Sequence, residues 1–476
     1  MKIICRALFV ATLTLIAPFL RGPLAHAQTQ TPVYFRHDHG LAAADQQTLP
    51  ELLEPDRAVW KQPLPPGHST PTIVGDRIFL TAHEGDDLAT ICLDRATGSP
   101  LWKQSIHVEQ LEKVHPEGSP AAATPACDGK RVYAFFGSFG LVCYDLDGTL
   151  AWTKKLGPFH DEFGAGSSPI VVDDKVILNE DHDFDSFLIA VRADNGETVW
   201  QTPRDGFTRS YSTPIVCEVG GRKQLIVAGA LQLVGYDVAS GRQLWSLDGF
   251  ARIVNTTPVK IDDTLFVCTW SPGGDTDARI AMEPWDKALA QWDKDGNGKL
   301  EDRELPAGEV RSRFYRIDLN DDKALDEIEW GKYARLFELA QNTLVALRLD
   351  AAGEAPKVMW EYKRGLPYVS SPLVYRGRLM LVKDGGIVTL LDAASGKLVK
   401  QGRAGGSGNY YASPVGGDGK IYTASGPGVV SVLRAGEQVE VISSHDFQER
   451  IAATPVLLGG RVYLRTEKAL YCFANP

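Results

Sequence analysis

The sequence predicts an all-β protein: an eight-bladed β-propeller of four-stranded blades, with a small α-helical EF-hand pair inserted in blade five. A triplet of Ser, Thr or Ala, then Ser or Thr, then proline recurs along the chain, with its prolines at Pro71, Pro125, Pro169, Pro214, Pro258, Pro372, Pro414 and Pro455. Successive prolines lie 54, 44, 45, 44, 114, 42 and 41 residues apart, so one repeat spans about 44 residues and one is longer by about 70. Two calcium-loop patterns lie within that longer repeat.

The first 27 residues have the parts of an export signal. Lys2 and Arg6 precede an apolar run from Ala7 to Leu20, and a small-x-small cleavage site ends at Ala27. The run has 14 residues, which is fewer than the ~20 that a membrane-spanning helix needs. We therefore expect an exported protein, periplasmic or secreted, with no transmembrane segment, in which residues 28–57 form an N-terminal extension.

The mature chain is acidic. Removal of the signal takes away three positive charges and moves the formal net charge from −10 to −13. Residues 271–342 alone carry 17 acidic and 11 basic side chains, so much of the negative charge is local. This balance argues against nucleic acid as a partner and favours cation binding within residues 271–342.

Each repeat follows one order of segments. A short apolar strand after the triplet is followed by a turn, an alternating strand, a variable loop, a second apolar strand, a tight turn and a strand that often ends in tryptophan. Four strands in about 44 residues, repeated eight times, are typical of a β-propeller. The propeller spans residues 58–270 and 343–476. Because the last repeat stops one strand short at Phe473, we expect residues 59–62 to complete the C-terminal blade.

The insertion, residues 271–342, carries the two calcium loops. Calcium takes six to eight oxygen ligands, which a twelve-residue loop supplies from alternate positions and a closing glutamate. The first loop supplies them from Asp293, Asp295, Asn297, the Lys299 carbonyl, Glu301 and Glu304. The second loop supplies them from Asp318, Asn320, Asp322, the Ala324 carbonyl, Asp326 and Glu329.

The second loop departs from the pattern at position six. Lys323 stands there in place of glycine, and a positive φ costs a residue with a side chain roughly 1 kcal/mol. We expect weaker calcium affinity there, and one or two ions per chain. Leu300 and Leu325 occupy position eight of the two loops, where a short β-bridge is expected. Pro306 limits the helix that leaves the first loop to about one turn.

The ends of the blades resemble the tryptophan docking motif of pyrroloquinoline quinone (PQQ) propellers. The clearest copies are Cys92 to Trp102, Gly235 to Trp245 and Ala190 to Trp200. The resemblance covers residues 58–476 outside the insertion. It implies an eight-bladed propeller of a family that includes quinoprotein dehydrogenases and a non-enzymatic propeller of the outer-membrane barrel assembly machinery. It implies structural roles for the motif residues, such as Asp94, Gly98 and Trp102.

PQQ is a possible cofactor on this resemblance, with bound calcium. Quinoprotein dehydrogenases typically carry two adjacent cysteines near the cofactor, whereas no two cysteines here are adjacent. The six cysteines that follow the signal lie mainly in apolar strand runs, so we expect them to be mostly free, buried thiols. No cofactor-binding or catalytic residue can be assigned.

Other polar residues are expected on the face from which the insertion emerges. The acidic run Glu180 to Asp185 reads as a solvated loop, with a second cation site as the alternative. Three arginines precede their triplets by five or six residues, where a ring of them would attract an anion: Arg209, Arg252 and Arg450. The connection between blades one and two contains His107, Lys113 and His115, which have no visible partner. Motifs of nucleophilic serine hydrolases, phosphate-binding loops and zinc proteases are absent.

The sequence favours a binding or scaffold module. We expect an exported calcium-binding PQQ-like propeller whose insertion forms a calcium-ordered lid on the ligand face, with a protein or extended ligand as partner. The alternative is a quinoprotein-like oxidoreductase that uses PQQ. A structural role in outer-membrane assembly is a third hypothesis, although no cysteine stands directly after the apolar run, where a lipid anchor would be attached.

Overall fold

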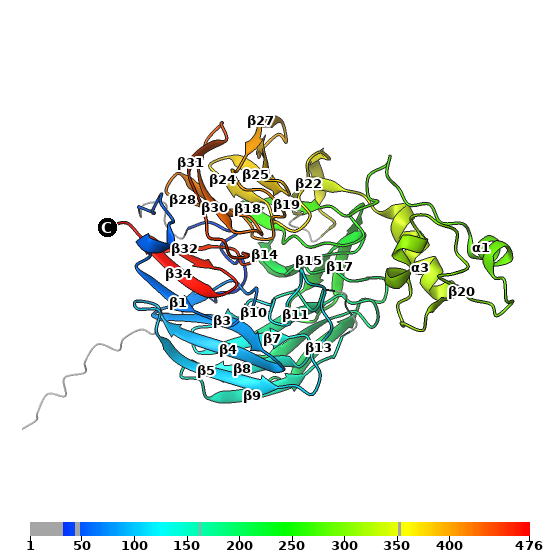
Figure 1. Cartoon of the computed structure of the whole chain (residues 1–476), viewed down its shortest axis with the longest axis horizontal. Coiled ribbons are helices and arrows are strands. Elements are labelled where there is room, and N and C mark those ends of the chain that lie inside the picture. Colours follow the sequence, from blue (N-terminus) through cyan, green and yellow to red (C-terminus); the bar gives the residue numbers. More distant parts are fainter. Residues whose placement is uncertain (1–31, 43–47, 160, 162, 351–353) are drawn as a thin grey trace, which may run out of the picture.

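A computed structural model describes residues 32–42, 48–159, 161, 163–350 and 354–476. Its strands form eight antiparallel four-stranded sheets around one axis, which confirms the predicted eight-bladed propeller (Figure 1). In blades one and three, for example, the strand after the triplet is fully buried and the last strand is mostly exposed. The export signal lies outside the described residues. No helix among the described residues is long and apolar enough to cross a membrane.

The first four blades follow the chain without interruption. They comprise β2 Thr72–Val74, β3 Arg77–Glu84, β4 Asp87–Asp94 and β5 Pro100–His107; β6 Ala126–Cys127, β7 Arg131–Phe136, β8 Gly140–Asp145 and β9 Leu150–Lys155; β10 Ile170–Val172, β11 Lys175–Glu180, β12 Phe187–Arg192 and β13 Thr198–Pro203; and β14 Ile215–Val219, β15 Arg222–Gly229, β16 Gln232–Asp237 and β17 Gln243–Asp248.

The last four blades include the interrupted one and the closing one. They comprise β18 Val259–Ile261, β19 Thr264–Thr269, β22 Thr343–Arg348 and β23 Lys357–Tyr362; β24 Leu373–Tyr375, β25 Arg378–Lys383, β26 Ile387–Asp392 and β27 Leu398–Arg403; β28 Val415–Gly417, β29 Lys420–Ala424, β30 Val429–Arg434 and β31 Glu440–Asp446; and β32 Val456–Leu458, β33 Arg461–Arg465 and β34 Ala469–Ala474 with β1 Trp60–Pro63.

The N-terminal strand closes the ring as predicted. β1 pairs antiparallel with β34, and Trp60 lies opposite Cys472. The two strands lie side by side at the C-terminus (Figure 1). The ring is therefore held shut by backbone hydrogen bonds between the two ends of the chain. A short 3-10 helix, Pro55–Arg57, precedes β1.

The repeated triplet links neighbouring blades. In seven of the eight blades, the backbone N–H of the second triplet residue donates to the side-chain hydroxyl of its counterpart in the next blade, for example Thr257 N to Ser371 Oγ at 3.0 Å. The same bond joins Thr70 to Thr124, Thr124 to Ser168, Ser168 to Thr213, Ser371 to Ser413, Ser413 to Thr454 and Thr454 to Thr70. A hydroxyl is therefore required at this position. It accepts a hydrogen bond from a buried backbone N–H of the preceding blade that makes no hydrogen bond within its own sheet.

Tryptophans of the docking motif join blades at their outer edge. Trp102 donates from Nε1 to Leu146 O of blade two at 2.9 Å and lies so close to Gly148 that a Cβ there would approach its ring to 2.8 Å. Asp94 holds its own turn by accepting from Thr97 N and Oγ1. These contacts agree with the structural roles expected for the motif. The apolar core lies between blades, as where Ile177 of blade three packs in one cluster with Val227 of blade four.

The six cysteines of the described chain are free and buried, as expected. They are Cys92, Cys127, Cys143, Cys217, Cys268 and Cys472. Burial raises the pKa of these thiols, for example that of Cys217 to about 12, so they remain protonated and fill space between the blades.

The insertion lies between the second and third strands of blade five, as predicted. It contains α1 Trp285–Trp292, β20 Leu300–Glu301, a 3-10 helix Arg311–Arg313, α2 Phe314–Ile317, β21 Ala324–Leu325 and α3 Glu327–Leu339. It projects from one side of the propeller, with α3 beside the blades and α1 farthest away (Figure 1). Asn342 closes its neck, because its amide accepts from Ser271 N at 2.8 Å and donates to Ser271 O at 3.1 Å.

The extension before β1 crosses the propeller. Val33 exchanges two backbone hydrogen bonds with Cys127 of blade two, and Ala42 donates to Gly416 O of blade seven. Between them, the buried Arg36 donates to Pro372 O of blade six at 2.7 Å. Since blades two and six stand opposite each other in a ring of eight, this segment passes beneath the central channel and closes it from one side.

Candidate functional site

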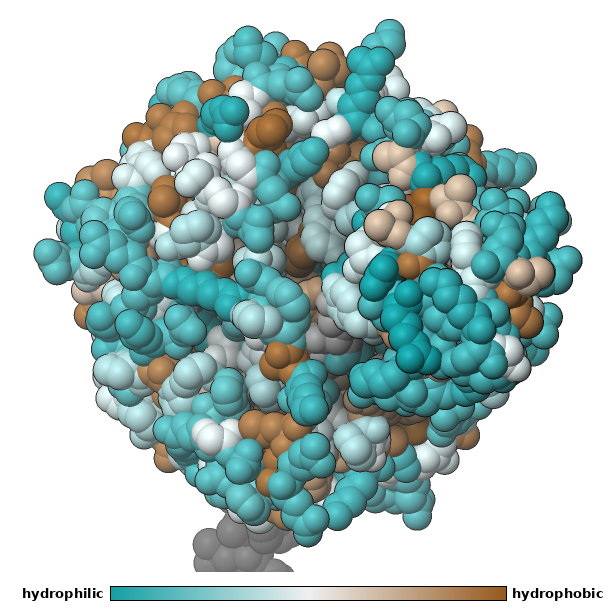
Figure 2. Space-filling model, turned by 45° about the vertical axis from the view of Figure 1, so that its right-hand side comes forward, coloured by the Kyte–Doolittle hydropathy of each residue, from teal (hydrophilic) through white to brown (hydrophobic). Residues whose placement is uncertain are grey.

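The central channel opens as a cup on the face that carries the insertion. Its volume is about 450 Å³, and Phe35 of the crossing segment lies at its closed end. Figure 2 shows this side of the molecule hollowed near its centre. The wall contains the triplet hydroxyls together with aromatic side chains from several blades, among them Phe163, Tyr211, Tyr368 and Tyr411. A cup of this size and composition can hold a small ligand or one group of a larger ligand.

A larger hollow of about 1100 Å³ lies on the opposite face. Its wall is made of residues of blades one to four and of the crossing segment, including Asp76, Arg77, Asp128 and Lys130. These residues belong to exposed or half-buried turns that hold strands together, as where Asp128 accepts from Arg131 N. The cup is the better candidate because polar groups from many blades converge in it.

The acidic run of blade three is not the solvated loop that the sequence favoured. Asp181, His182 and Asp183 are at most 3% exposed. Arg204 forms a two-pronged ion pair with Asp181 at 2.6 and 2.8 Å, and Arg209 pairs with Asp183 at 2.8 Å. The error arises because the two partner arginines lie more than 20 residues later in the chain, so the sequence offers no local sign that the acids are neutralised.

Behind the cup wall lies a buried group of acids around His182, which the sequence did not predict as a unit. Nε2 of His182 lies 2.8 Å from Glu180, its Nδ1 lies 3.8 Å from Asp161, and its ring stacks on Phe159. Tyr211 of the cup wall donates to Asp161 at 2.6 Å. Glu112 stands close to this group, with both carboxylate oxygens buried.

Burial shifts the pKa values of this group. Burial, reinforced by Asp161 and Glu180, raises the pKa of Glu112 to about 8. Burial also raises the pKa of Glu180 to about 7, against the lowering effect of His182. Burial alone would lower the pKa of His182, but Asp161 and Glu180 outweigh it and raise the value to about 10. The group therefore retains protons at neutral pH.

The three arginines before the triplets do not form a ring of free cations. Arg209 is paired with Asp183, and Arg450 is paired with Glu117 at 2.8 Å. Arg252 is 3% exposed and donates from Nε to Pro272 O at 3.2 Å. No carboxylate partner of Arg252 occurs among the described residues.

Of the three candidate residues in the connection between blades one and two, one lies in the cup. His115 lies in the cup wall, with its ring centre 4.9 Å from that of Phe163. His107 lies on the exposed outer strand β5 and contacts Asp87 at 2.9 Å. Lys113 is exposed and does not line the cup. These three residues are therefore not brought together.

In the first predicted calcium loop, three carboxylates converge. Asp293, Asp295 and Glu304 each offer an oxygen, and these oxygens lie within 4.8 Å of one another. Glu304, at position twelve, is 4% exposed and accepts from Lys294 N and Glu301 N, so it closes the loop. Asn297 and Glu301 bond to each other at 2.7 Å and lie beside this group. The arrangement suits a hard cation that collects carboxylate oxygens.

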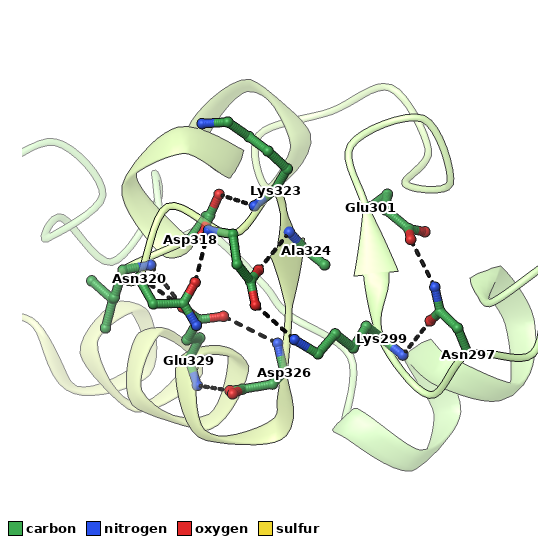
Figure 3. A network of polar contacts seen from close by, with 11 residues as sticks. Asn297, Lys299, Glu301, Asp318, Asn320, Lys323, Ala324, Asp326 and Glu329 are labelled. Carbon is green, nitrogen blue, oxygen red and sulfur yellow. Dashed lines mark hydrogen bonds and ion pairs between the residues drawn. The ribbon is translucent and has the colours of Figure 1, made fainter.

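The second loop is wrapped around its own acids (Figure 3). Glu329 is 2% exposed and accepts from Leu319 N and Asp326 N, while Asp326 accepts from Glu329 N to form a capping box at the start of α3. Asp318 is buried and accepts from Asp322 N and Lys323 N. Burial raises the pKa values of Asp318 and Glu329. Lys323 adopts a φ of +73°, the conformation expected for position six.

The two loops lie back to back. β20 pairs with β21 so that Leu300 lies opposite Leu325, which confirms the predicted bridge. The Lys299 side chain, from position seven of the first loop, donates to Asp322 of the second at 2.7 Å. Ala324 lies opposite Glu301 in the same pair of strands. Between the loops, the described chain has two short helices, the 3-10 helix Arg311–Arg313 and the four-residue α2.

The insertion is fixed to the propeller and reaches the cup. Trp330 and Phe337 of α3 pack in one cluster with Leu231 of blade four, and Lys332 donates to Asp183 O of blade three at 2.7 Å. Pro272 at the neck and Arg316 of α2 line the cup. Arg316 lies two residues before Asp318, so the second loop is connected to the cup wall by one turn of helix.

Comparisons with known proteins agree with the fold. The family model described as outer membrane protein assembly factor BamB matches residues 30–138 and 89–323. Similar structures include BamB from Moraxella catarrhalis (13% identity, TM-score 0.53, covering 87% of this chain and 99% of that one) and a europium-containing methanol dehydrogenase (12%, 0.55, 88% and 93%). A third is the quinohemoprotein alcohol dehydrogenase from Comamonas testosteroni (10%, 0.52, 88% and 76%). No curated protein matches the sequence. At these identities the structural likenesses show the fold alone.

Proposed function

The chain belongs to the family described as outer membrane protein assembly factor BamB, and from this premise we propose that it is an exported, calcium-binding module that binds a ligand in its cup. The partner is a protein or another extended ligand, one group of which enters the cup. The calcium ions order the insertion at the cup's rim. One observation carries the proposal: Arg316, which lines the cup, is separated by one residue from Asp318, the first predicted ligand of the second calcium loop.

The donor set of the insertion fits calcium. In the first loop three carboxylate oxygens already lie within 4.8 Å of one another, and Asn297 lies beside them. In the second, burial raises the pKa values of Asp318 and Glu329, so a cation there would offset the cost of burying their negative charges. Asp293, Asp295, Asn297 and Glu304 would hold one ion, and Asp318, Asn320, Asp322 and Glu329 the other. The ion would join the start of each loop to its closing glutamate.

Calcium titration of the mature protein in a calorimeter tests this proposal. We expect one or two ions to bind, and we expect the double variant Asp293→Ala, Asp318→Ala to lose that heat and to be cut faster by protease within residues 271–342. Asp302→Ala is the control, because Asp302 is exposed and occupies no ligand position. If the native protein binds no calcium and the double variant is cut like the control, the calcium-ordered insertion is refuted.

A quinoprotein-like oxidoreductase is the second candidate. The cup is closed at one end, has aromatic walls and lies on the propeller axis. A methanol dehydrogenase has the same fold. The adjacent cysteine pair typical of the quinoproteins that the chain resembles is absent, since the six cysteines of the described chain are separate and free. Incubation with PQQ and calcium separates the candidates. Bound quinone absorbance with alcohol- or sugar-dependent dye reduction would favour the enzyme, and loss of all quinone on gel filtration would favour the binding module.

A further inference from the structure

A ring of hydroxyl groups surrounds the inner part of the cup. The second residue of the repeated triplet is serine or threonine in all eight blades, and in every blade except the fifth it lines the cup. These seven residues form the hydroxyl ring, and each is at most 8% exposed: Thr70, Thr124, Ser168, Thr213, Ser371, Ser413 and Thr454. The ring is therefore both buried and part of the cup wall.

Each oxygen of the hydroxyl ring already accepts one hydrogen bond. It accepts from a backbone N–H of the preceding triplet, as where Thr454 Oγ1 accepts from Ser413 N at 3.1 Å. A hydroxyl also has one proton to donate. Among the described residues, no acceptor receives the proton of any of the seven groups.

The hydroxyl ring is thus a set of buried donors without acceptors. A buried donor that is left unsatisfied lowers stability, so a group that accepts these protons would be bound favourably. The bond that each oxygen accepts from an N–H polarises the hydroxyl and strengthens it as a donor. A ligand group that itself donates would compete with the backbone N–H for the same oxygen. The ring therefore suits a group with acceptor oxygens and no proton of its own to donate.

A buried cation lies beneath the hydroxyl ring. Arg36 of the crossing segment is 5% exposed and lines a second hollow of about 140 Å³, which three residues of the ring also line. Its guanidinium donates to the carbonyls of two triplet prolines, Pro372 at 2.7 Å and Pro414 at 3.4 Å. Burial lowers the pKa of Arg36 to about 10, against the raising effect of Asp38, so the side chain is charged at neutral pH. This charge favours acceptor oxygens at the ring and disfavours a cationic group.

Aromatic side chains line the cup together with the hydroxyl ring. Phe163 and Tyr211 meet edge to face with their ring centres 6.1 Å apart. The acid Glu117 in the same wall accepts from Arg450 at 2.8 Å and from Tyr411. A wall of this kind suits a flat or ring-shaped body, which aromatic side chains contact by their faces and edges.

We propose that the ligand group that reaches the hydroxyl ring carries carbonyl or carboxylate oxygens, which accept hydrogen bonds from the ring, and that the body attached to it lies against the aromatic wall. This inference rests on the proposed binding function of the cup and defines the chemistry of the group that enters. The triplet serine or threonine then has two roles. Its oxygen joins neighbouring blades, and its proton binds the ligand.

Four probes that share a benzene ring test the proposal. We would measure the binding of acetophenone, benzoate, ethylbenzene and benzylamine to the calcium-loaded mature protein by ligand-observed NMR. Acetophenone and ethylbenzene have nearly the same shape and differ in the carbonyl oxygen. In an apolar pocket ethylbenzene would bind more tightly, because the carbonyl would lose its hydrogen bonds to water.

We expect the opposite order in the cup. Acetophenone, benzoate or both should bind at least about fivefold more tightly than ethylbenzene and benzylamine, as one hydrogen bond in a buried site provides. The tighter of the two shows whether the ring takes a carbonyl or a carboxylate. Equal affinities of all four probes would mean that water occupies the ring and would overturn the proposal, as would no binding of any probe at millimolar concentration.

Variants locate the bound oxygen. Ser371→Ala and Thr124→Val each remove one hydroxyl, from blades six and two, which stand opposite each other. At least one of them should lower the affinity ratio of the tighter acceptor probe to ethylbenzene about threefold. Ser371→Thr keeps the hydroxyl and should keep the ratio. Ser431→Ala removes a buried hydroxyl of blade seven outside the cup and should also keep it.

The ratio is the measured quantity because a general loosening of the cup would weaken both probes alike. Thermal unfolding shows which variants are folded. An unchanged ratio in the folded Ser371→Ala and Thr124→Val variants would contradict the assignment to the hydroxyl ring. If only one of them folds, that variant decides, and if neither folds, the four-probe comparison on the native protein decides alone.

Repeating the probe titrations with a calcium chelator separates this inference from the calcium proposal. A preference for acceptor probes in a protein that binds no calcium would leave the hydroxyl ring as a binding site and refute the calcium-ordered insertion. Calcium binding together with equal affinities for the four probes would do the reverse.

Discussion

Glu112 shows how one residue behind the cup can set the pH response of the protein. Its pKa is raised to about 8, that of Glu180 to about 7 and that of His182 to about 10. All three folded values lie above their unfolded values, so the folded protein binds more protons than the unfolded chain across this range. Stability from these groups is therefore present at low pH and is lost as the pH rises through the folded values.

Glu112→Gln should flatten this dependence. Between pH 6 and pH 8 the free energy of unfolding of the native protein should fall by on the order of 2 kcal/mol through Glu112. One unit of pKa difference corresponds to about 1.4 kcal/mol. The free energy of unfolding of the variant should fall less over the same pH range. At pH 9 the variant should be more stable than the native protein, as measured by urea unfolding. Glu109→Gln, an exposed change three residues earlier, should follow the native curve. Parallel curves for Glu112→Gln and the native protein would show that this carboxyl is not protonated.

The triplet hydroxyls make a second prediction for single residues. Ser371→Ala should destabilise the protein by about 1–3 kcal/mol, because the buried N–H of Thr257 loses its acceptor. Ser105→Ala on an exposed outer strand should have little effect. Chemical unfolding of both variants measures the difference, and equal midpoints would mean that water replaces the lost hydroxyl.

Among the elements, the insertion depends on the backbone of its second loop. Lys323 holds a φ of +73°, which glycine adopts without strain. Lys323→Gly should therefore tighten the second calcium site by roughly 1 kcal/mol, or about fivefold, in calorimetry. Lys294→Gly removes the same charge at a position without positive φ and should not tighten binding. A second site that is no tighter in Lys323→Gly would show that loop strain does not limit affinity.

Two segments show why the sequence did not predict all parts of the site. His182 and the acids beside it read as a solvated loop, but Arg204 and Arg209 of the next connection bury them. Residues 32–42 showed no repeat and no motif, yet they form the floor of the cup. In both cases the contacting residues lie far away in the sequence, so no local sequence pattern predicts the contact.

For the whole molecule, we predict that the closing strand β1 controls the cooperativity of unfolding. Deletion of the mature chain up to Gln62 removes β1, the pairing of Trp60 with Cys472 and the contact of Trp60 with Gly98. We expect the single sharp thermal transition to be replaced by a broad transition at lower temperature, because β34 becomes an open edge in an interrupted ring. Removal of residues 28–31 alone serves as the control. A truncated protein that melts like the full mature chain would refute the closure.

The sequence by itself determined the fold of this protein, because propeller blades are local: the strands, turns and docking tryptophans of each blade lie within about 44 consecutive residues. It likewise placed the insertion in blade five and the bridge between Leu300 and Leu325, since both follow from spacing. Only the tertiary structure decided what surrounds the channel. The floor at Phe35, the acids behind the wall around Glu112 and Arg316 of the insertion come from separate segments, and the folded ring with its insertion brings them to one cup.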